Sequence, residues 1–374
     1  MLKFPENFYW GTATSAYQVE GGIKNDWSMI GKKFDAGIAC DHYHKFEEDF
    51  DLAKSLNNNA HRFSIEWARI EPEEGKFDQK EIEHYRKVIL ALKERGLEPF
   101  MTLYHWTLPI WFVEKGGWLN EDAPKDFGRF VGKIVSEYKD LVKFWITLNE
   151  PDNVYAVLSF LIGKWPPFIK NWFKFRRVCK QLIITHKEIY ELIHKISPDA
   201  FVGIAQNYTH FKGFLKILNT FWNQKFLNKI ENHHDFIGLN YYFHHSLSEI
   251  LKLSHRKRTD IGWEIYPEGI YHVLKDFKKY NKPIYITENG LADAKDEKRT
   301  KFIIEHLKWV YKAIEEGVDV RGYFHWSLLD NFEWDKGFEP RFGLIEIDYK
   351  TFQRIPRPSS RVYAEICKNN GTNL

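Results

Sequence analysis

The stretch Lys143-Phe-Trp-Ile-Thr-Leu-Asn-Glu-Pro151 is a short apolar run that ends in a glutamate and a turn-forming proline. Its aromatic and β-branched residues favour extended backbone. A second run, near residues 283–287, ends in the same way at Glu288-Asn-Gly290. Each glutamate is therefore predicted to lie at the end of a strand, held on rigid backbone and presented at the mouth of the fold.

The rest of the chain alternates similar apolar runs with longer amphipathic segments, which is the pattern of βα units. We predict eight strands, near residues 8–14, 58–65, 97–104, 143–149, 201–206, 235–241, 283–287 and 321–326. The spacing of apolar residues predicts helices over 41–56, 79–95, 123–139, 171–196, 267–280 and 298–316. No linker divides the chain. These features favour one (β/α)8 barrel domain over residues 1–374, rather than a doubly wound sheet with an added domain.

The composition is that of a globular protein with a large core, at 44% hydrophobic and 28% charged residues. The aromatic share of 17% suits a cleft that stacks on the apolar faces of sugars, as well as a core rich in large rings. The 54 basic and 51 acidic residues give a net charge of +3, which creates no general field for a polyanion. We therefore expect no nucleic-acid partner.

The cysteines and the start of the chain bear on cellular location. Cys40, Cys179 and Cys367 are odd in number and lack a metal-binding spacing, so we expect reduced thiols. The first residues show no signal-peptide pattern, and no run of about 18 uncharged apolar residues could cross a membrane. A cytoplasmic location is the expectation that follows.

In a (β/α)8 barrel, catalytic groups come from the carboxyl ends of several strands. Every predicted strand except the fifth has polar or aromatic residues that suit such a site: Gln18 and Glu20, Arg62, Tyr104-His105-Trp106, Asn149-Glu150, Asn240-Tyr241-Tyr242, Glu288-Asn289-Gly290 and His325-Trp326-Ser327. Glycoside hydrolysis needs two carboxyl groups, one to protonate the leaving oxygen and one to attack or to activate water. Glu150 and Glu288 are candidates for this pair.

These residues fall in motifs that resemble the family 1 glycoside hydrolases, the β-glucosidase and β-galactosidase group, across nearly the whole chain. The motifs occur in the order of that family: Ala16-Tyr-Gln18-Val-Glu20-Gly, His61-Arg62-Phe-Ser-Ile-Glu-Trp67, Leu103-Tyr-His105-Trp106-Thr-Leu-Pro109, Thr147-Leu-Asn149-Glu150-Pro151, Gly238-Leu-Asn240-Tyr-Tyr242, Thr287-Glu288-Asn289-Gly290 and His325-Trp326-Ser-Leu-Leu-Asp-Asn-Phe-Glu333-Trp334. The resemblance implies Glu150 as acid/base and Glu288 as nucleophile, with retention of the anomeric configuration.

The resemblance also implies the supporting residues. Arg62 and Tyr242 are expected beside Glu288, with Asn240 as a further support. The expected sugar contacts are Gln18, His105, Trp106, Asn149, Glu333 and Trp334, with Trp326 as the floor of the pocket and Phe342 at its edge. The structural alternative for Arg62, Tyr242, His105, Trp326 and Phe342 is a role in core packing or buried pairing.

Substrate class can be narrowed from the same motifs. Glu333-Trp334 lies near the segment with which the phospho-glycosidases of the family bind a 6-phosphate on the sugar. An unphosphorylated β-glucoside is therefore expected as substrate, with β-galactosides and β-fucosides as further candidates. The alternative is a carbohydrate-binding barrel with weak catalysis and an altered aglycone side.

The pair His42-x-His44 does not share a helix face, and neither a P-loop nor a GxGxxG fingerprint is present. We expect no metal and no cofactor.

Two features set this chain apart from the family that it resembles. Only 90 residues separate Glu150 from Asn240 (240 minus 150), which predicts shortened βα loops and a more open aglycone side.

Residues 164–177 interleave bulky aromatics with five positive charges and no acid. This segment could wall the aglycone site, favour an apolar leaving group, touch an anionic membrane surface, or simply form a loop and the first turns of an amphipathic helix. Oligomeric state cannot be predicted from the sequence.

Overall fold

Eight parallel strands close into a barrel in the computed structural model, which describes residues 2–251 and 254–372. Around the barrel the strand order is β10-β11-β2-β3-β4-β5-β6-β8. The strands are β2 (Tyr9–Ala13), β3 (Ala60–Ser64), β4 (Glu98–Thr102), β5 (Phe144–Asn149), β6 (Phe201–Asn207), β8 (Phe236–Asn240), β10 (Ile284–Asn289) and β11 (Val320–Trp326). The predicted (β/α)8 barrel and its eight strands are confirmed.

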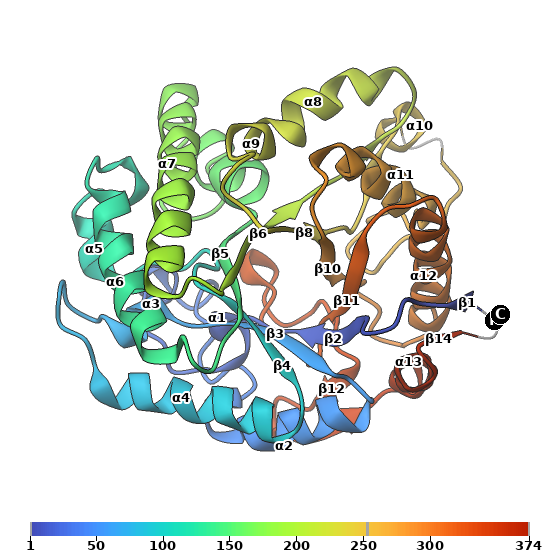
Figure 1. Cartoon of the computed structure of the whole chain (residues 1–374), viewed down its shortest axis with the longest axis horizontal. Coiled ribbons are helices and arrows are strands. Elements are labelled where there is room, and N and C mark those ends of the chain that lie inside the picture. Colours follow the sequence, from blue (N-terminus) through green and yellow to red (C-terminus); the bar gives the residue numbers. More distant parts are fainter. Residues whose placement is uncertain (1, 252–253, 373–374) are drawn as a thin grey trace.

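Helices surround this ring of strands on all sides (Figure 1). The six predicted helices are present as α2 (His42–Ser55), α4 (Gln79–Glu94), α6 (Ala123–Tyr138), α7 (Trp172–Ile196), α11 (Glu268–Phe277) and α12 (Arg299–Glu315). Some begin at side-chain caps: Asp78 accepts from the backbone N–H of Lys80 at 2.8 Å, and Asn171 accepts from that of Lys174 at 3.0 Å. Residues 164–177 are accordingly a loop followed by the first turns of α7.

Several smaller elements escaped the prediction. Helix α13 (Pro358–Asn369) was missed although Tyr363, Ile366 and Cys367 form its buried face. The others have six residues or fewer, too few to show a period: α1 (Ala16–Val19), α3 (Trp67–Ile70), α5 (Ile110–Glu114), α8 (Leu218–Trp222), α9 (Gln224–Lys229), α10 (Leu247–Ile250), and the 3-10 turns η1 (Ser28–Ile30), η2 (Gly117–Leu119), η4 (Gly213–Ile217) and η6 (Trp334–Lys336). The helix predicted over 267–280 ends in the 3-10 turn η5 (Lys278–Tyr280). Three short pairs are β1 (Leu2–Lys3) with β14 (Gly371–Thr372), β7 (His210–Phe211) with β9 (His244–His245), and β12 (Ile345–Ile347) with β13 (Arg354–Pro356).

Large aromatic rings fill the interior of the barrel below the carboxyl ends of its strands. Phe100 on β4 stacks on Phe144 of the neighbouring β5, with ring centroids 4.1 Å apart. It also meets Phe324 at 4.8 Å, on a strand that is not its neighbour, so these rings touch across the barrel interior. Gly203 pairs with Phe236 in the sheet, and a methyl group at Gly203 would come within 2.6 Å of the Phe236 ring. Glycine at this position therefore makes room for a ring, and the rings fill the space beneath the catalytic end.

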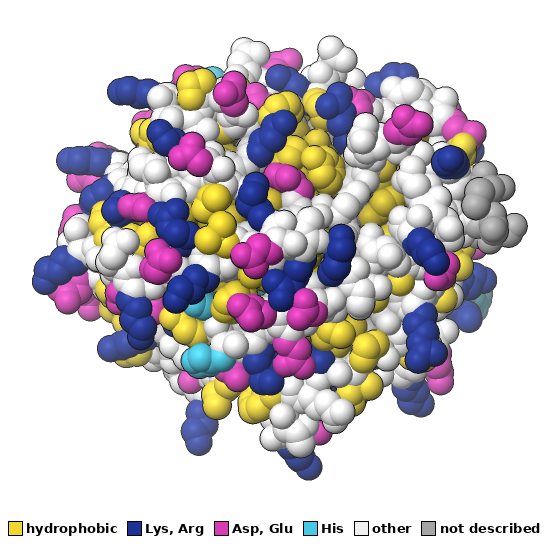
Figure 2. All heavy atoms as spheres, turned by 60° about the horizontal axis from the view of Figure 1, so that its bottom comes forward, with side chains coloured by type: hydrophobic (Ala, Val, Ile, Leu, Met, Phe, Trp, Pro, Cys, Tyr) yellow, Lys and Arg dark blue, Asp and Glu magenta, His cyan; other side chains and the backbone are white. Residues whose placement is uncertain are grey.

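The outer surface mixes charges of both signs. On the face shown in Figure 2, Lys and Arg side chains alternate with Asp and Glu side chains.

Cys40, Cys179 and Cys367 are buried free thiols, as predicted. Among the helices of residues 2–251 and 254–372, none combines the length and apolar character needed to cross a membrane.

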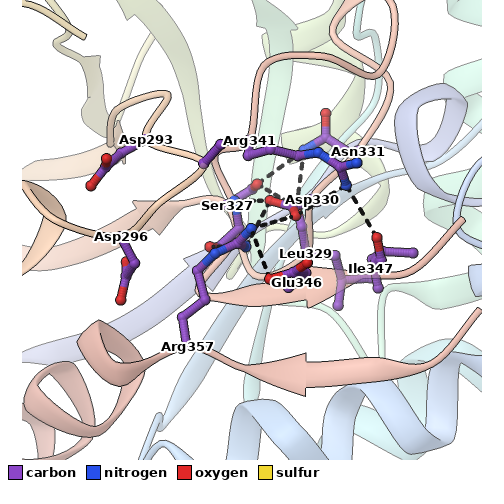
Figure 3. A network of polar contacts seen from close by, with 12 residues as sticks. Asp293, Asp296, Ser327, Leu329, Asp330, Asn331, Arg341, Glu346, Ile347 and Arg357 are labelled. Carbon is purple, nitrogen blue, oxygen red and sulfur yellow. Dashed lines mark hydrogen bonds and ion pairs between the residues drawn. The ribbon is translucent and has the colours of Figure 1, made fainter. Parts of the chain in front are cut away.

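A buried aspartate ties the segment after β11 to the end of the chain (Figure 3). Asp330 is fully buried and accepts from the guanidinium of Arg357 at 3.0 Å and from the backbone N–H of Gly343 at 2.9 Å. Arg341 lies 3.3 Å from its other oxygen. The next residue, Asn331, donates to the Ser327 hydroxyl at 2.9 Å. This network fixes the loop from which several pocket residues project.

Asp330→Asn is expected to destabilise the protein by about 3–5 kcal/mol, because it removes the fully buried carboxylate that two arginines share. Chemical denaturation would measure the loss. Asp319→Asn is the matched control, because Asp319 pairs with Arg321 at 2.8 Å on the surface. That change is expected to cost less than about 1 kcal/mol. Equal losses from both variants would contradict a structural role for the network.

Candidate active site

Glu150 lies at the carboxyl end of β5, held by two amides. Its Oε1 accepts from Asn240 Nδ2 at 2.8 Å and from Asn207 Nδ2 at 3.2 Å. Its backbone N–H donates to the carbonyl of Ala205 at 2.7 Å, which fixes it to the neighbouring strand β6. A π-helix, η3 (Pro151–Leu161), begins immediately after it, and Glu150 itself has a left-handed φ of 45°. Strained backbone and π-helical turns both occur preferentially at functional sites.

Glu288 lies on β10 in a different environment. Its Oε1 forms an ion pair with Arg62, and its Oε2 accepts from the Tyr242 hydroxyl at 2.6 Å. Arg62 also donates to Asn149 Oδ1 at 2.7 Å. Glu288 is 4% exposed and Glu150 is 3% exposed. The two buried carboxyl groups are thus distinguished by their partners, a cation and a phenol for one, and neutral amides for the other.

The electrostatics of Glu150 follow from this arrangement. Burial raises the pKa of Glu150 to about 8, and the negative charge of Glu288 contributes to the rise. Hydrogen bonds from Asn240 and Asn207 oppose it but are the weaker effect. The raised pKa favours the protonated form of Glu150 at neutral pH. Burial, with the charge of Glu288, likewise raises the pKa of Glu333 to about 8.

Both glutamates line a pocket of about 290 Å³ at the barrel mouth. Tyr242, expected as a support of Glu288, lines it too, as do most of the expected sugar contacts: Gln18, His105, Trp106, Trp326, Glu333, Trp334 and Phe342. The His105 ring lies nearly parallel to those of Trp326 and Trp334, at centroid distances of 6.1 and 6.0 Å. Gln18 Nε2 lies 3.4 Å from Glu333 Oε2. The pocket therefore combines flat rings with hydrogen-bonding groups.

Three expected residues lie around the pocket rather than among its lining residues. Arg62, Asn149 and Asn240 form a connected layer, because Asn149 Oδ1 accepts from Arg62 at 2.7 Å and from Asn240 at 3.1 Å. Asn149 Nδ2 in turn lies 3.3 Å from His105 Nε2. The indole N–H of Trp106 donates to the backbone carbonyl of Asn149 at 2.9 Å. The layer links Glu288, Glu150 and two rings of the pocket, His105 and Trp106.

Sequence reasoning missed Asn207, which supplies the contribution of the fifth strand. It stands opposite Asn240 in the β6–β8 register and donates to Glu150. The strand was predicted to end at residue 206, one position short, so Asn207 fell outside the search for strand-end residues. Other lining residues that were missed come from η3 and from the loop after β8: Asn153, Val154, Val157, Leu158, Phe243 and Trp263.

One contact crosses the rim of the pocket. Asp335, in η6, forms an ion pair with Lys164 at 2.8 Å and accepts from the Trp165 indole at 2.8 Å. These groups follow β11 and β5, which stand four positions apart in the eight-stranded barrel and hence on opposite sides. Lys164 and Trp165 wall the pocket, in agreement with one interpretation of residues 164–177. The wider opening expected on the aglycone side stays a prediction.

The histidines near the start of α2 have carboxylate partners. His42 lies 2.7 Å from Asp49, and His44 lies 2.7 Å from Asp41. Over residues 2–251 and 254–372, no group of three or more His, Cys, Asp and Glu side chains is arranged to hold a metal ion.

Comparisons with known proteins agree with the fold. A family model described as "Glycosyl hydrolase family 1" matches residues 1–213 and 216–372. Beta-glucosidase A of Thermotoga maritima is 36% identical over 440 aligned positions, covering 99% of this chain and 98% of the relative. A beta-galactosidase of Sulfolobus acidocaldarius is 30% identical over 475 positions, covering 99% of this chain and 96% of the relative. The solved beta-glycosidase from Pyrococcus horikoshii superposes with a TM-score of 0.93 at 40% identity, covering 100% of this chain and 96% of that one.

The alignment lengths also bear on the loops. A chain of 374 residues fills at most 374 of the 440 positions aligned with the Thermotoga maritima relative, so at least 66 positions of that relative have no counterpart here (440 minus 374). Because all eight strands of the barrel are present, the missing residues belong to its connections, as predicted. The chain therefore belongs to glycosyl hydrolase family 1, and it is an O-glycosyl hydrolase.

Proposed function

We propose that this protein is a retaining β-glycosidase that acts on unphosphorylated β-glucosides, with Glu288 as nucleophile and Glu150 as acid/base. The observation that carries the proposal is the contrast between two buried carboxyl groups in one pocket. Glu288 is paired with Arg62 and Tyr242, whereas Glu150 has only amide partners and a raised pKa. A pair of this kind divides the work of glycoside hydrolysis between an attacking group and a proton donor.

In the first step, a carboxylate oxygen of Glu288 attacks the anomeric carbon while the bond to the aglycone oxygen breaks. Glu150 transfers its proton to that departing oxygen. Ester formation removes the negative charge of Glu288, and with it one cause of the raised pKa of Glu150. Glu150 is then suited to accept a proton from water, whose oxygen attacks the anomeric carbon and releases Glu288.

The sugar is expected to be unphosphorylated because the pocket already holds carboxyl groups at Glu288, Glu150 and Glu333. A phosphate would add negative charge beside them, and the lysines that line the pocket, Lys164 and Lys336, are exposed at its rim. Relatives are named as beta-glucosidases and beta-galactosidases, so β-glucosides and β-galactosides, together with β-fucosides, are candidate substrates.

We also propose that residues 1–374 act as one catalytic domain, because strands from the whole barrel contribute to the pocket.

The test is p-nitrophenol release from β-glucoside, β-galactoside and β-fucoside substrates by the purified chain. Release from the β-glucoside supports the proposal, and the relative rates rank the sugars. Proton NMR of the first product should show the β anomer, because two inversions retain configuration. An α product would exclude the retaining mechanism. Calorimetric binding of deoxynojirimycin without turnover of any substrate would instead support the catalytically weak sugar-binding barrel.

The pH profile provides a further prediction. Glu150 acts as an acid only when it is protonated, so kcat/KM should fall as pH rises through about 8. On p-nitrophenyl β-glucoside, Glu150→Gln should lose this basic limb, and in the wild type the limb should shrink for a 2,4-dinitrophenyl glucoside, whose leaving group needs no proton. Because the pKa of Glu333 is also raised to about 8, Glu333→Gln is the control, and it should keep the limb. A basic limb that survives in Glu150→Gln would contradict the assignment.

A further inference from the structure

An exposed apolar surface borders the catalytic pocket around the start of α7. Phe173 is 78% exposed and Trp172 is 45% exposed, and Met29, Ile30 and Phe168 are exposed as well. Single exposed apolar residues are common in proteins, but a group of large ones marks a surface that meets an apolar partner.

Three of these residues share one groove, and the other two follow it closely in the chain. Met29, Ile30 and Phe168 line a single groove of about 420 Å³, together with Pro166 and Pro167. Trp172 lies four residues beyond Phe168 and begins α7, the helix at the upper left of Figure 1. Trp165, which precedes the two prolines, lines the catalytic pocket. The groove and the pocket thus share a wall.

Positive charges surround this area. Lys170, Lys174 and Arg176 are exposed, and none has an ion-pair partner within residues 2–251 and 254–372. Lys32 and Lys33 are exposed just beyond Ile30. The acids that line the groove are Glu114 and Asp26, and burial raises the pKa of Asp26 well above its usual range. The cations exposed around the groove therefore outnumber the acids that line it, although the whole chain carries only +3.

We propose that this apolar-basic lip, made of Met29, Ile30, Phe168, Lys170, Trp172, Phe173, Lys174 and Arg176, binds an anionic membrane surface. Trp and Phe side chains insert at the boundary between headgroups and acyl chains, while Lys and Arg side chains meet anionic headgroups. A second copy of the chain is a poorer partner, because like charges on two lips would repel each other. The inference rests on surface chemistry and does not depend on the proposed function.

The test is sedimentation of the full chain with vesicles made of equal parts of phosphatidylcholine and phosphatidylglycerol. The wild type should bind them and should bind vesicles of phosphatidylcholine alone at least about tenfold more weakly. Trp172→Ser/Phe173→Ser and Lys170→Gln/Lys174→Gln should each weaken binding to the mixed vesicles by about tenfold or more. None of these residues lines the catalytic pocket, so release of p-nitrophenol in free solution reports that the variants are folded.

Phe214→Ser/Ile217→Ser is the matched control. These two residues are as exposed, at 69% and 82%, but lie on η4 and line neither the groove nor the catalytic pocket. The control should bind the mixed vesicles as the wild type does. Failure of the wild type to bind, or an equal loss in the control, overturns the proposal. So does a dimer in sedimentation velocity that Trp172→Ser/Phe173→Ser dissociates, because the lip is then an interface between copies.

Discussion

Glu288→Gln is expected to lower kcat for p-nitrophenyl β-glucoside by a factor on the order of 10⁴ or more, because an amide cannot form the covalent intermediate. The side chain keeps its size and can still accept from the Tyr242 hydroxyl, so the fold should be kept. Steady-state rates on the same preparation, with thermal melting to verify folding, provide the measurement.

A matched control is Glu66→Gln. Glu66 is also a buried glutamate that follows a barrel strand, but it accepts from Thr107 at 2.9 Å and is not among the residues that line the catalytic pocket. Its kcat should stay near that of the wild type. If Glu288→Gln and Glu66→Gln lost activity equally, the loss would reflect a disturbed fold rather than a missing nucleophile.

An added small nucleophile identifies the attacking face. In Glu288→Gly, azide can occupy the vacated position and displace the aglycone in one inversion, which gives an α-glycosyl azide. In Glu150→Gly, azide instead attacks the covalent intermediate from the opposite face, which gives a β-glycosyl azide. Exchanged products would reverse the roles proposed for the two glutamates.

Glu150→Gln has the second largest expected effect, and its size should depend on the leaving group. General acid catalysis contributes about 10²–10⁴-fold, so an alkyl β-glucoside, whose leaving alkoxide is a strong base, should lose nearly that whole factor in kcat/KM. A 2,4-dinitrophenyl β-glucoside needs no proton and should react at close to the wild-type rate in the glycosylation step. The slope of log(kcat/KM) against leaving-group pKa, compared between variant and wild type, measures the difference. Parallel slopes would show that Glu150 is not the proton donor.

Much of the fold and of the site could be predicted because it depends on local pattern. Alternating apolar runs and amphipathic segments determine strands and helices, and all eight strands and six main helices lie where the sequence predicted them. The carboxyl ends of parallel strands meet at one mouth of a barrel. Glu150 and Glu288 could therefore be paired from the sequence alone, although they lie 138 residues apart in the chain (288 minus 150). The expected cytoplasmic location stays a prediction.

Contacts between distant loops could not be predicted. Asn207 was missed because strand ends are uncertain by a residue or more, and here the last residue of β6 is the one that donates to Glu150. Nothing near Asp335 in the sequence indicates that Lys164 and Trp165 lie against it. The same holds for Asp330, whose partner Arg357 is 27 residues away in the chain.

The sequence by itself determined the barrel, the family and the two glutamates, because period, turn residues and motif order are properties of short segments. The family resemblance also placed Arg62 and Tyr242 beside Glu288, but only the tertiary structure showed which groups hold Glu150. Glu288 has Arg62 and Tyr242 beside it, while Glu150 has Asn240 and Asn207, and these partners come from β3, from β6, and from the end of β8 and the residues after it. A pKa depends on burial and on charges within a few ångströms, and barrel closure alone brings those groups together.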